Sequence, residues 1–179
     1  MDEEFGLVIV DLTAGRSYAT EIVLAATARP ELQGVPSRWV VFHRWTRQHI
    51  VAAGGLVHGS QGIVDNGVRF GHDRTALAEA IGFVRTAVLD PSQPDTGLRT
   101  EQLAWLDVCN RRLDELASSR GAGRAHLLGE VPLDPVLQWQ EQLISNDDVW
   151  LHRTANERTV NAFEHLARKI IDESSWVGL

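Results

Sequence analysis

An unbroken apolar run, Gly6 to Val10, stands near the start of the chain and ends at Asp11. Continuous apolarity without polar alternation is typical of a strand that is buried on both faces. We therefore predict a strand over Phe5–Val10, in a mainly parallel sheet that helices cover on both sides. Ligands of such sheets bind just beyond the carboxyl ends of the strands. Residues 11–17 directly follow the carboxyl end of this predicted strand.

Two later segments have the same character and are also predicted to be strands, Arg38–His43 and His126–Val131. The segment Phe83–Leu89 fits either a strand or the end of a helix. Apolar residues at three- and four-residue steps favour one helix that begins at Asp73, a good N-cap, and continues to Val88. The residues on the inner face of that helix would be Leu77, Ile81, Val84 and Val88.

The same spacing predicts further helices, of which Leu98–Ser118 is the clearest. The pair Gly54–Gly55 inside another predicted helix either admits a second backbone closely or breaks the helix. Residues 62–72 are polar and rich in glycine, so we expect a surface loop there. The remaining predicted helices are Arg16–Ala28 with Ser17 as N-cap, Thr46–Gln61, Val136–Ile144, and a terminal helix opened by a capping box at Thr154–Glu157.

Together these elements predict a single α/β domain over residues 1–179, with three layers and a mainly parallel sheet flanked by helices. Hydrophobic residues make up 44% and charged residues 23% of the 179 residues, which is ordinary for a globular protein. The linker around residues 91–97 is expected to be a loop inside this domain, because neither flank is able to bury a core alone.

Net charge and cysteine content limit the binding partners and the cellular location that we expect. The formal net charge of −7 gives no general attraction to nucleic acid or to anionic lipid, and we expect neither as a partner. Cys109 is the only cysteine, so the chain has no internal disulfide and no cysteine metal cage. The start of the chain is acidic and no apolar run approaches the roughly 20 residues of a membrane span. A cytoplasmic location is therefore expected.

Lysine is almost absent from the sequence: Lys169 is the only one, among 17 basic residues. A phosphate-binding P-loop has the pattern G-x-x-x-x-G-K-[ST], in which the lysine reaches the phosphates. Lys169 lies in a predicted helix without a glycine beside it, so this pattern does not occur in the sequence.

The first candidate site follows the N-terminal run and consists of Asp11, Thr13, Ala14 and Gly15. A carboxylate at this position is suited to a metal ion or a metal-bound water. A glycine lets the backbone approach a phosphate closely, and the N-terminus of the next helix points free N–H groups at an anion. The alternative is that a buried strand simply ends in an aspartate before a turn.

A second candidate site follows the third predicted strand, in Pro132-Leu133-Asp134-Pro135. Aspartate followed by proline is a strong helix start, with the aspartate as N-cap and the proline at the first helical position. Asp134 therefore caps a helix, or contacts a ligand beyond the sheet, or does both.

The two motifs, in this order and at this separation, resemble those of the MinD/ParA-type variant P-loop ATPases. In that family a buried strand ends in an aspartate followed by small residues and a glycine, and a later Pro-x-Asp loop lies beside the nucleotide base. Thr13 stands where the family often has proline, and Arg16 is outside the usual motif. A narrower resemblance, to actinobacterial variant P-loop proteins, covers Trp39–Gln48 and Pro132–Leu143.

This resemblance implies the C-terminal part of an incomplete P-loop NTPase-like fold, with ATP and Mg²⁺ as ligands. Asp11 would hold the Mg²⁺ ion, and Asp11 with the Gly15 amide would be the catalytic groups. The nucleotide-binding residues would also include Thr13, Ala14, Pro132 and Asp134. Because the phosphate-binding loop and its lysine are missing, we expect these residues alone to be catalytically impaired.

Three other interpretations stay open. In the first, Asp11 is a nucleophile that accepts a phosphoryl group. Enzymes of that kind carry a second aspartate two positions later as acid/base partner, and Thr13 stands there in this sequence. His43, with Arg44 and Arg47, either serves an anion or is a hydrogen-bonded core histidine. Finally, the chain would be a non-enzymatic partner-binding or regulatory module, as a homodimer or with another protein, if the edge of an incomplete sheet is exposed.

Overall fold

The computed structural model describes residues 6–12, 17–32, 34–92, 97–139 and 146–176. Three strands form a parallel sheet in the order β1-β2-β3: β1 is Trp39–Arg44, β2 is Ile81–Val88 and β3 is Leu127–Pro132. The α/β class and the parallel sheet are therefore confirmed, as are the predicted strands at β1 and β3.

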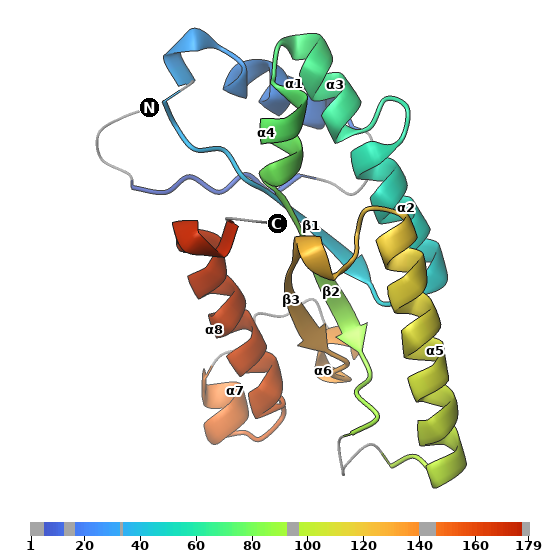
Figure 1. The fold of residues 1–179 in the computed structure, drawn as a ribbon. Coiled ribbons are helices and arrows are strands. Elements are labelled where there is room, and N and C mark those ends of the chain that lie inside the picture. The colour runs from blue at the N-terminus through green and yellow to red at the C-terminus, as the bar shows by residue number, and fades with distance from the viewer. Residues whose placement is uncertain (1–5, 13–16, 33, 93–96, 140–145, 177–179) are drawn as a thin grey trace.

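Helices cover both faces of this sheet, as Figure 1 shows with α2 and α5 on one side and α8 on the other. The helices of the first half are α1 (Tyr18–Thr27), η1 (Pro30–Leu32), α2 (Arg47–His58), α3 (Ile63–Phe70) and α4 (Arg74–Glu79). Those of the second half are α5 (Thr100–Ser119), η2 (Arg124–His126), α6 (Val136–Trp139), α7 (Asn146–Trp150), α8 (Glu157–Ile171) and η3 (Glu173–Trp176).

The central strand β2 separates two hydrophobic clusters, because neighbouring residues of a strand point to opposite faces. Phe83 belongs to the larger cluster, under α1 to α4, whereas Val84 belongs to the cluster under α8 and η3. A third cluster joins the end of β1 to α2 and α5, around Trp45, Ile50 and Ala117. These three clusters are the core on which the positions of the polar residues depend.

Side-chain caps start several of the described helices. Ser17, Thr46 and Asp73 each accept a hydrogen bond from the backbone N–H three residues later, as is typical of N-caps. The final helix begins at Glu157 with Asn156 as its cap, so the capping box predicted to start at Thr154 is wrong by two residues. Thr154 instead donates its hydroxyl to the Asp148 carbonyl.

Two predicted elements have the wrong type. The helix that begins after Asp73 ends at Glu79, and Ile81–Val88 is the central strand of the sheet. Its first five residues are all buried, so both of its faces are covered and a helical spacing of apolar residues arose by chance. Residues 63–70 form α3 and not a surface loop, because Ile63, Val64 and Gly67 pack inward against the core.

The strand predicted over Phe5–Val10 is wrong for the part of it that the structure describes. Residues 7–12 have no regular secondary structure, and the side chains of Leu7, Val8, Ile9 and Val10 are 56%, 58%, 81% and 56% exposed. Only Leu12 packs against the large core cluster. Apolarity predicts burial but does not specify the partner, and among the described residues the sheet ends at β1.

The glycine pair of α2 provides a close approach between two helices. The helix continues through both glycines, and the backbone at the end of α5 lies against Gly54. A Cβ atom built on Gly54 would be 2.7 Å from the Arg120 carbonyl oxygen, whereas one built on Gly55 would meet nothing within 4 Å. The first of the two alternatives for this pair, close approach, therefore describes Gly54.

We expect Gly54→Ala to lower the free energy of unfolding by about 1–3 kcal/mol, because the Arg120 backbone must move to admit the methyl group. Gly55→Ala is the matched control and should raise stability by up to about 1 kcal/mol through helix propensity alone. Urea unfolding followed by circular dichroism measures both variants. Equal effects of the two substitutions would contradict the close packing of α2 on α5.

Candidate functional site

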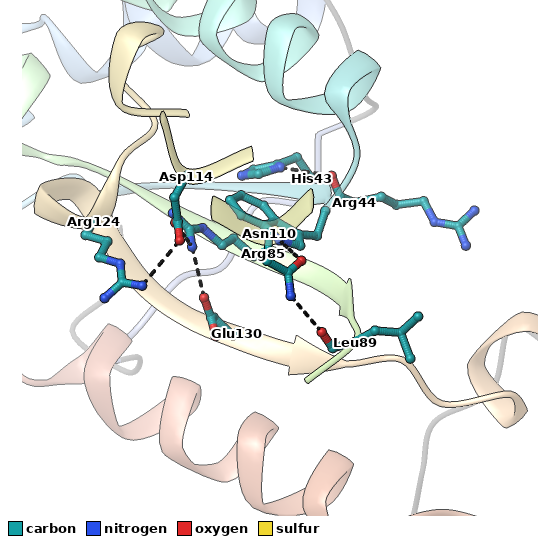
Figure 2. A network of polar contacts seen from close by, with 9 residues as sticks. His43, Arg44, Arg85, Leu89, Asn110, Asp114, Arg124 and Glu130 are labelled. Atoms are coloured by element: carbon teal, nitrogen blue, oxygen red, sulfur yellow. Dashed lines mark hydrogen bonds and ion pairs between the residues drawn. The ribbon is translucent and has the colours of Figure 1, made fainter. Parts of the chain in front are cut away.

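A row of polar residues crosses the sheet at one level of its three strands. His43 of β1 is in register with Arg85 of β2, and Arg85 is in register with Glu130 of β3. Both His43 and Arg85 are buried, with 5% and 2% of their surfaces exposed. Such burial is unusual for a charged residue such as Arg85. Helix α5 adds Asp114 to this row, and Figure 2 shows Asp114 beside Arg85. We treat these four residues, called here the polar row, as the candidate site.

Arg85 is the centre of the polar row. Its Nη1 atom lies 2.8 Å from Asp114 Oδ1 and 3.1 Å from Glu130 Oε1. The contact with Asp114 is an ion pair without hydrogen-bond alignment, since the same carboxylate oxygen makes no hydrogen bond. On its flat side, the guanidinium carbon lies 3.8 Å from the centroid of the Trp45 ring. Two carboxylates and an aromatic face thus offset the cost of burying this charge.

The partners of Arg85 are themselves held in place. Asp114 also pairs with Arg124, whose Nη2 is 3.3 Å from Asp114 Oδ2 at the surface. Trp45 donates its ring N–H to the side-chain oxygen of Asn110 over 3.1 Å. Asn110 in turn donates its amide to the Leu89 carbonyl, also over 3.1 Å, as Figure 2 shows. Helix α5 is therefore fixed to the carboxyl ends of β1 and β2 by polar contacts as well as by packing.

His43 is a neutral core histidine in this arrangement. Its Nδ1 atom donates to the Arg44 carbonyl over 3.1 Å, which leaves Nε2 as the acceptor nitrogen. The ring lies 6.2 Å from the Trp45 ring and 6.1 Å from the Phe83 ring, centroid to centroid. Burial lowers the pKa of His43, and the positive charge of Arg85 lowers it further, against the opposing effect of the Arg44 hydrogen bond. The hydrogen-bonded core interpretation of His43 therefore agrees with its surroundings.

The polar row keeps unused hydrogen-bonding atoms. Within the described part of the chain, His43 Nε2 and the Nε and Nη2 atoms of Arg85 have no hydrogen-bond partner. The row thus presents two cationic donors and one neutral acceptor beside its carboxylates. The two donors and the acceptor are all buried from solvent. The row contains no hydroxyl or thiol side chain.

The residues predicted to bind nucleotide lie in different places. Asp11 is exposed in the irregular N-terminal segment and does not end a strand. Thr13, Ala14 and Gly15 lie outside the described residues. Pro132 ends β3 opposite Val88 of β2, at the carboxyl edge of the sheet as expected. A common site for Asp11 and the Pro132–Asp134 loop stays a prediction.

Asp134 is buried, with 4% of its surface exposed, and both of its carboxylate oxygens accept hydrogen bonds. Oδ1 accepts from the Val136 N–H at 3.1 Å, which caps α6. Oδ2 accepts from the Asn156 N–H at 3.0 Å and from the Thr159 hydroxyl at 2.7 Å. The predicted capping role is confirmed, and Asp134 also ties the start of α8 to the end of β3. Its contact with a nucleotide base stays a prediction.

Lys169 is held inside the fold as well. Its ammonium group, on α8, donates to the Leu128 carbonyl of β3 over 2.9 Å. The only lysine of the sequence therefore stabilises the packing of the last long helix on the sheet. Three or more histidine, cysteine, aspartate or glutamate side chains do not gather into a metal-binding group anywhere in the described ranges. No described helix combines the length and apolarity needed to cross a bilayer.

The structure also contains an open cleft of about 360 Å³, away from the polar row. It lies between the start of α1, the end of α2 and the start of α3, and its polar lining includes Glu21, Asn66 and Arg69. Asn66 is already bound there, because it donates to the Gln61 carbonyl and accepts from Arg69. Two of its polar lining residues, Asn66 and Arg69, are therefore bound to each other.

Sequence reasoning missed most of the polar row. Arg85 was the available signal: it is a lone charge inside the otherwise apolar segment 81–89. A buried charge requires partners, so this position pointed to carboxylates elsewhere in the chain. Asp114 and Glu130 are not distinguishable by sequence from the other acidic residues, since only the strand register and the packing of α5 bring them to Arg85.

Comparison with known proteins adds no relative to this description. The sequence matches none of the protein families, none of the curated proteins and none of the solved structures with which it was compared.

We expect Asp134→Ala to lower the free energy of unfolding by about 3 kcal/mol or more, because it leaves the Thr159 hydroxyl and two backbone N–H groups without an acceptor. Thr159→Val removes one donor and should cost about 1–2 kcal/mol. In the double variant the costs should be less than additive, since the two residues share a hydrogen bond. Strict additivity in urea unfolding would contradict this contact.

Stability should fall as the pH is lowered through the histidine range. Folding lowers the pKa of His43, and burial also lowers the pKa of His126, below the ordinary value of 6.5. Below that value the unfolded chain takes up protons that the folded chain does not, so stability is full above pH 6.5 and decreases toward the lowered pKa.

His43→Gln should therefore flatten the dependence of unfolding free energy on pH between 7.5 and 5.5. The matched control is His165→Gln, which changes an exposed histidine on α8 and should leave the slope as it is. Urea unfolding at several pH values measures the slope. An unchanged slope in His43→Gln would show that His43 does not contribute to it.

Proposed function

We propose that this chain is a variant P-loop NTPase-like module, related to the MinD/ParA-type ATPases, that does not turn over ATP with these residues alone. The relationship is supported by a parallel sheet whose third strand runs into Pro132-Leu133-Asp134, at the edge where open α/β sheets bind ligands. The Asp11–Gly15 motif supports it from the sequence.

The position of Lys169 is the observation that supports the absence of ATP turnover in this proposal. Phosphoryl transfer depends on cations that neutralise the charge on the phosphates. Lys169 is bound to the Leu128 carbonyl on the α8 side of the sheet, and it is the only lysine of the sequence. Asp134 is likewise engaged by three internal donors. Of the charged groups of the predicted site, Asp11 takes part in no ion pair within the described residues, and a single carboxylate makes a weak Mg²⁺ site.

A second candidate function, binding of a protein partner, is favoured by the uncovered face of β1. Helix α8 packs on β3, whereas Phe42 of β1 points to the same side of the sheet and is 53% exposed. An edge strand with an exposed aromatic residue is a typical place for an extended segment of another chain to add. In this function the nucleotide-type fold would act as a scaffold.

We expect calorimetric titration with Mg²⁺–ATP to show binding that is weak or absent, and a phosphate-release assay to show no turnover above background. Asp11→Ala should change neither result. Asp107→Ala, which removes another exposed aspartate on α5, is the control. Turnover that disappears in Asp11→Ala and persists in Asp107→Ala would contradict the proposal, because it would identify Asp11 as part of a working catalytic site.

A further inference from the structure

The N-terminal run has the composition of a buried strand but lies in solvent. Leu7, Val8, Ile9 and Val10 are more than half exposed, and Ile9 is 81% exposed. Most of these residues have high strand propensity, and burial of their side chains would be favourable. Leu12, at the end of the run, is packed against the core of its own molecule. The run is thus anchored at one end, with its apolar side chains uncovered.

The outer side of β1 is the complementary surface. Trp39 and Trp45 donate their backbone N–H groups to carbonyls of β2 and its flank, at Ala80 and Thr86. Because backbone groups of alternate residues point to opposite sides of a strand, those of Val40 and Phe42 point away from β2. Among the described residues, β1 pairs only with β2, so this side offers a free ladder of hydrogen-bonding groups.

We propose that residues 6–11 of one molecule pair in parallel with β1 of a second copy of this chain, and that the exchange is reciprocal. In this dimer the partner of the partner-binding function proposed above is a second copy of the chain, so the dimer rests on that function. Each copy contributes one run and one edge, so the assembly closes as a two-fold dimer and does not extend into a fibre. The extra strand would enlarge each sheet from three strands to four.

The sequence of the run selects the register. Six residues, Gly6–Asp11, match the six residues of β1, and a parallel alignment places Ile9 beside Phe42 on one face. Ile9 is the most exposed apolar side chain of the run, and Phe42 is the most exposed apolar side chain of β1. The same alignment places the Asp11 carboxylate beside the Arg44 guanidinium at the ends of the strands. Neither side chain takes part in an ion pair within the described ranges, and their charges are opposite.

A second copy is the favoured occupant because one chain carries both halves of the interface. The run has no charged residue before Asp11, and the exposed Phe42 gives the edge an apolar side chain to receive it. Parallel pairing also agrees with the sheet to which the run would be added. Main-chain hydrogen bonds would supply much of the affinity, with the alternate side chains setting the register.

The test is sedimentation velocity of the full chain between about 1 and 100 µM, a range that covers Kd values typical of moderate protein association. Wild type should be a dimer. Ile9→Glu and Phe42→Glu should each raise the dimer dissociation constant by about tenfold or more, because a charge would be buried beside an apolar residue. Val35→Glu alters an exposed apolar residue elsewhere and is the matched control. The thermal unfolding of Ile9→Glu should match that of wild type under dilute conditions.

Charge reversal tests the register. Asp11→Arg alone and Arg44→Asp alone should each weaken the dimer by about two- to fivefold, and the double variant should restore wild-type affinity, because like charges on neighbouring strands repel. Mixing Ile9→Glu with Phe42→Glu should give association that neither variant shows alone, since one intact run then meets one intact edge. A wild-type monomer over the whole concentration range, or a dimer that Ile9→Glu leaves intact, would overturn the exchange.

A final arm separates this inference from the broader partner-binding function. If wild type is monomeric, a synthetic peptide of alternating valine and threonine is added, and hydrogen exchange of the Val40 and Phe42 amides is followed. Protection of those two amides would keep β1 as a binding edge while excluding the second copy as its occupant. Absence of protection would contradict both.

Discussion

Burial of a positive charge in the central strand is the constraint on which the rest of the structure depends. Arg85 lies in β2 with its side chain 3% exposed, so its charge must be offset within the protein. Three separate elements supply the offset: Asp114 comes from α5, Glu130 from β3, and Trp45 from the end of β1. Each of these elements must be in place for Arg85 to be tolerated, which links the correct position of α5 to the correct pairing of all three strands.

On the other side of the sheet, Asp134 and Lys169 form hydrogen bonds that connect α8 to β3 and to the loop after it. Asp134 joins the end of β3 to the start of α8, and Lys169 joins the later part of α8 to the β3 carbonyl of Leu128. Both residues have the chemistry that a nucleotide site requires, yet both act here as connections inside the fold. Polar residues on both sides of the sheet therefore serve mainly to hold helices on strands, while the N-terminal run and Phe42 of β1 expose apolar side chains.

Local sequence pattern predicts several helices and strands but not the apolar run at residues 6–10, whose burial depends on a partner. Helices α1, α2 and α5 and the strands β1 and β3 were expected close to where they lie, and the caps at Ser17 and Asp73 were identified from local chemistry. The segment Ile81–Val88 was assigned to a helix because a strand buried on both faces also satisfies helical spacing over a few residues. Tertiary information was needed there, and equally for the polar row, whose members come from four separate elements. At Asp134, local sequence predicted the bond to Val136 but not the bonds to Asn156 and Thr159.

The all-parallel arrangement has a consequence for the newly made chain on the ribosome. Every strand pair joins residues that are far apart in sequence, as with Trp39 and Ile81, so no pair forms from a local hairpin. β2 gains its second neighbour only when β3 has been synthesised, and the apolar residues around Val84 stay uncovered until Leu166 and Trp176 arrive. For most of its synthesis the nascent chain therefore exposes the surfaces that molecular chaperones recognise, and interruption of translation before α8 would leave a product prone to aggregation.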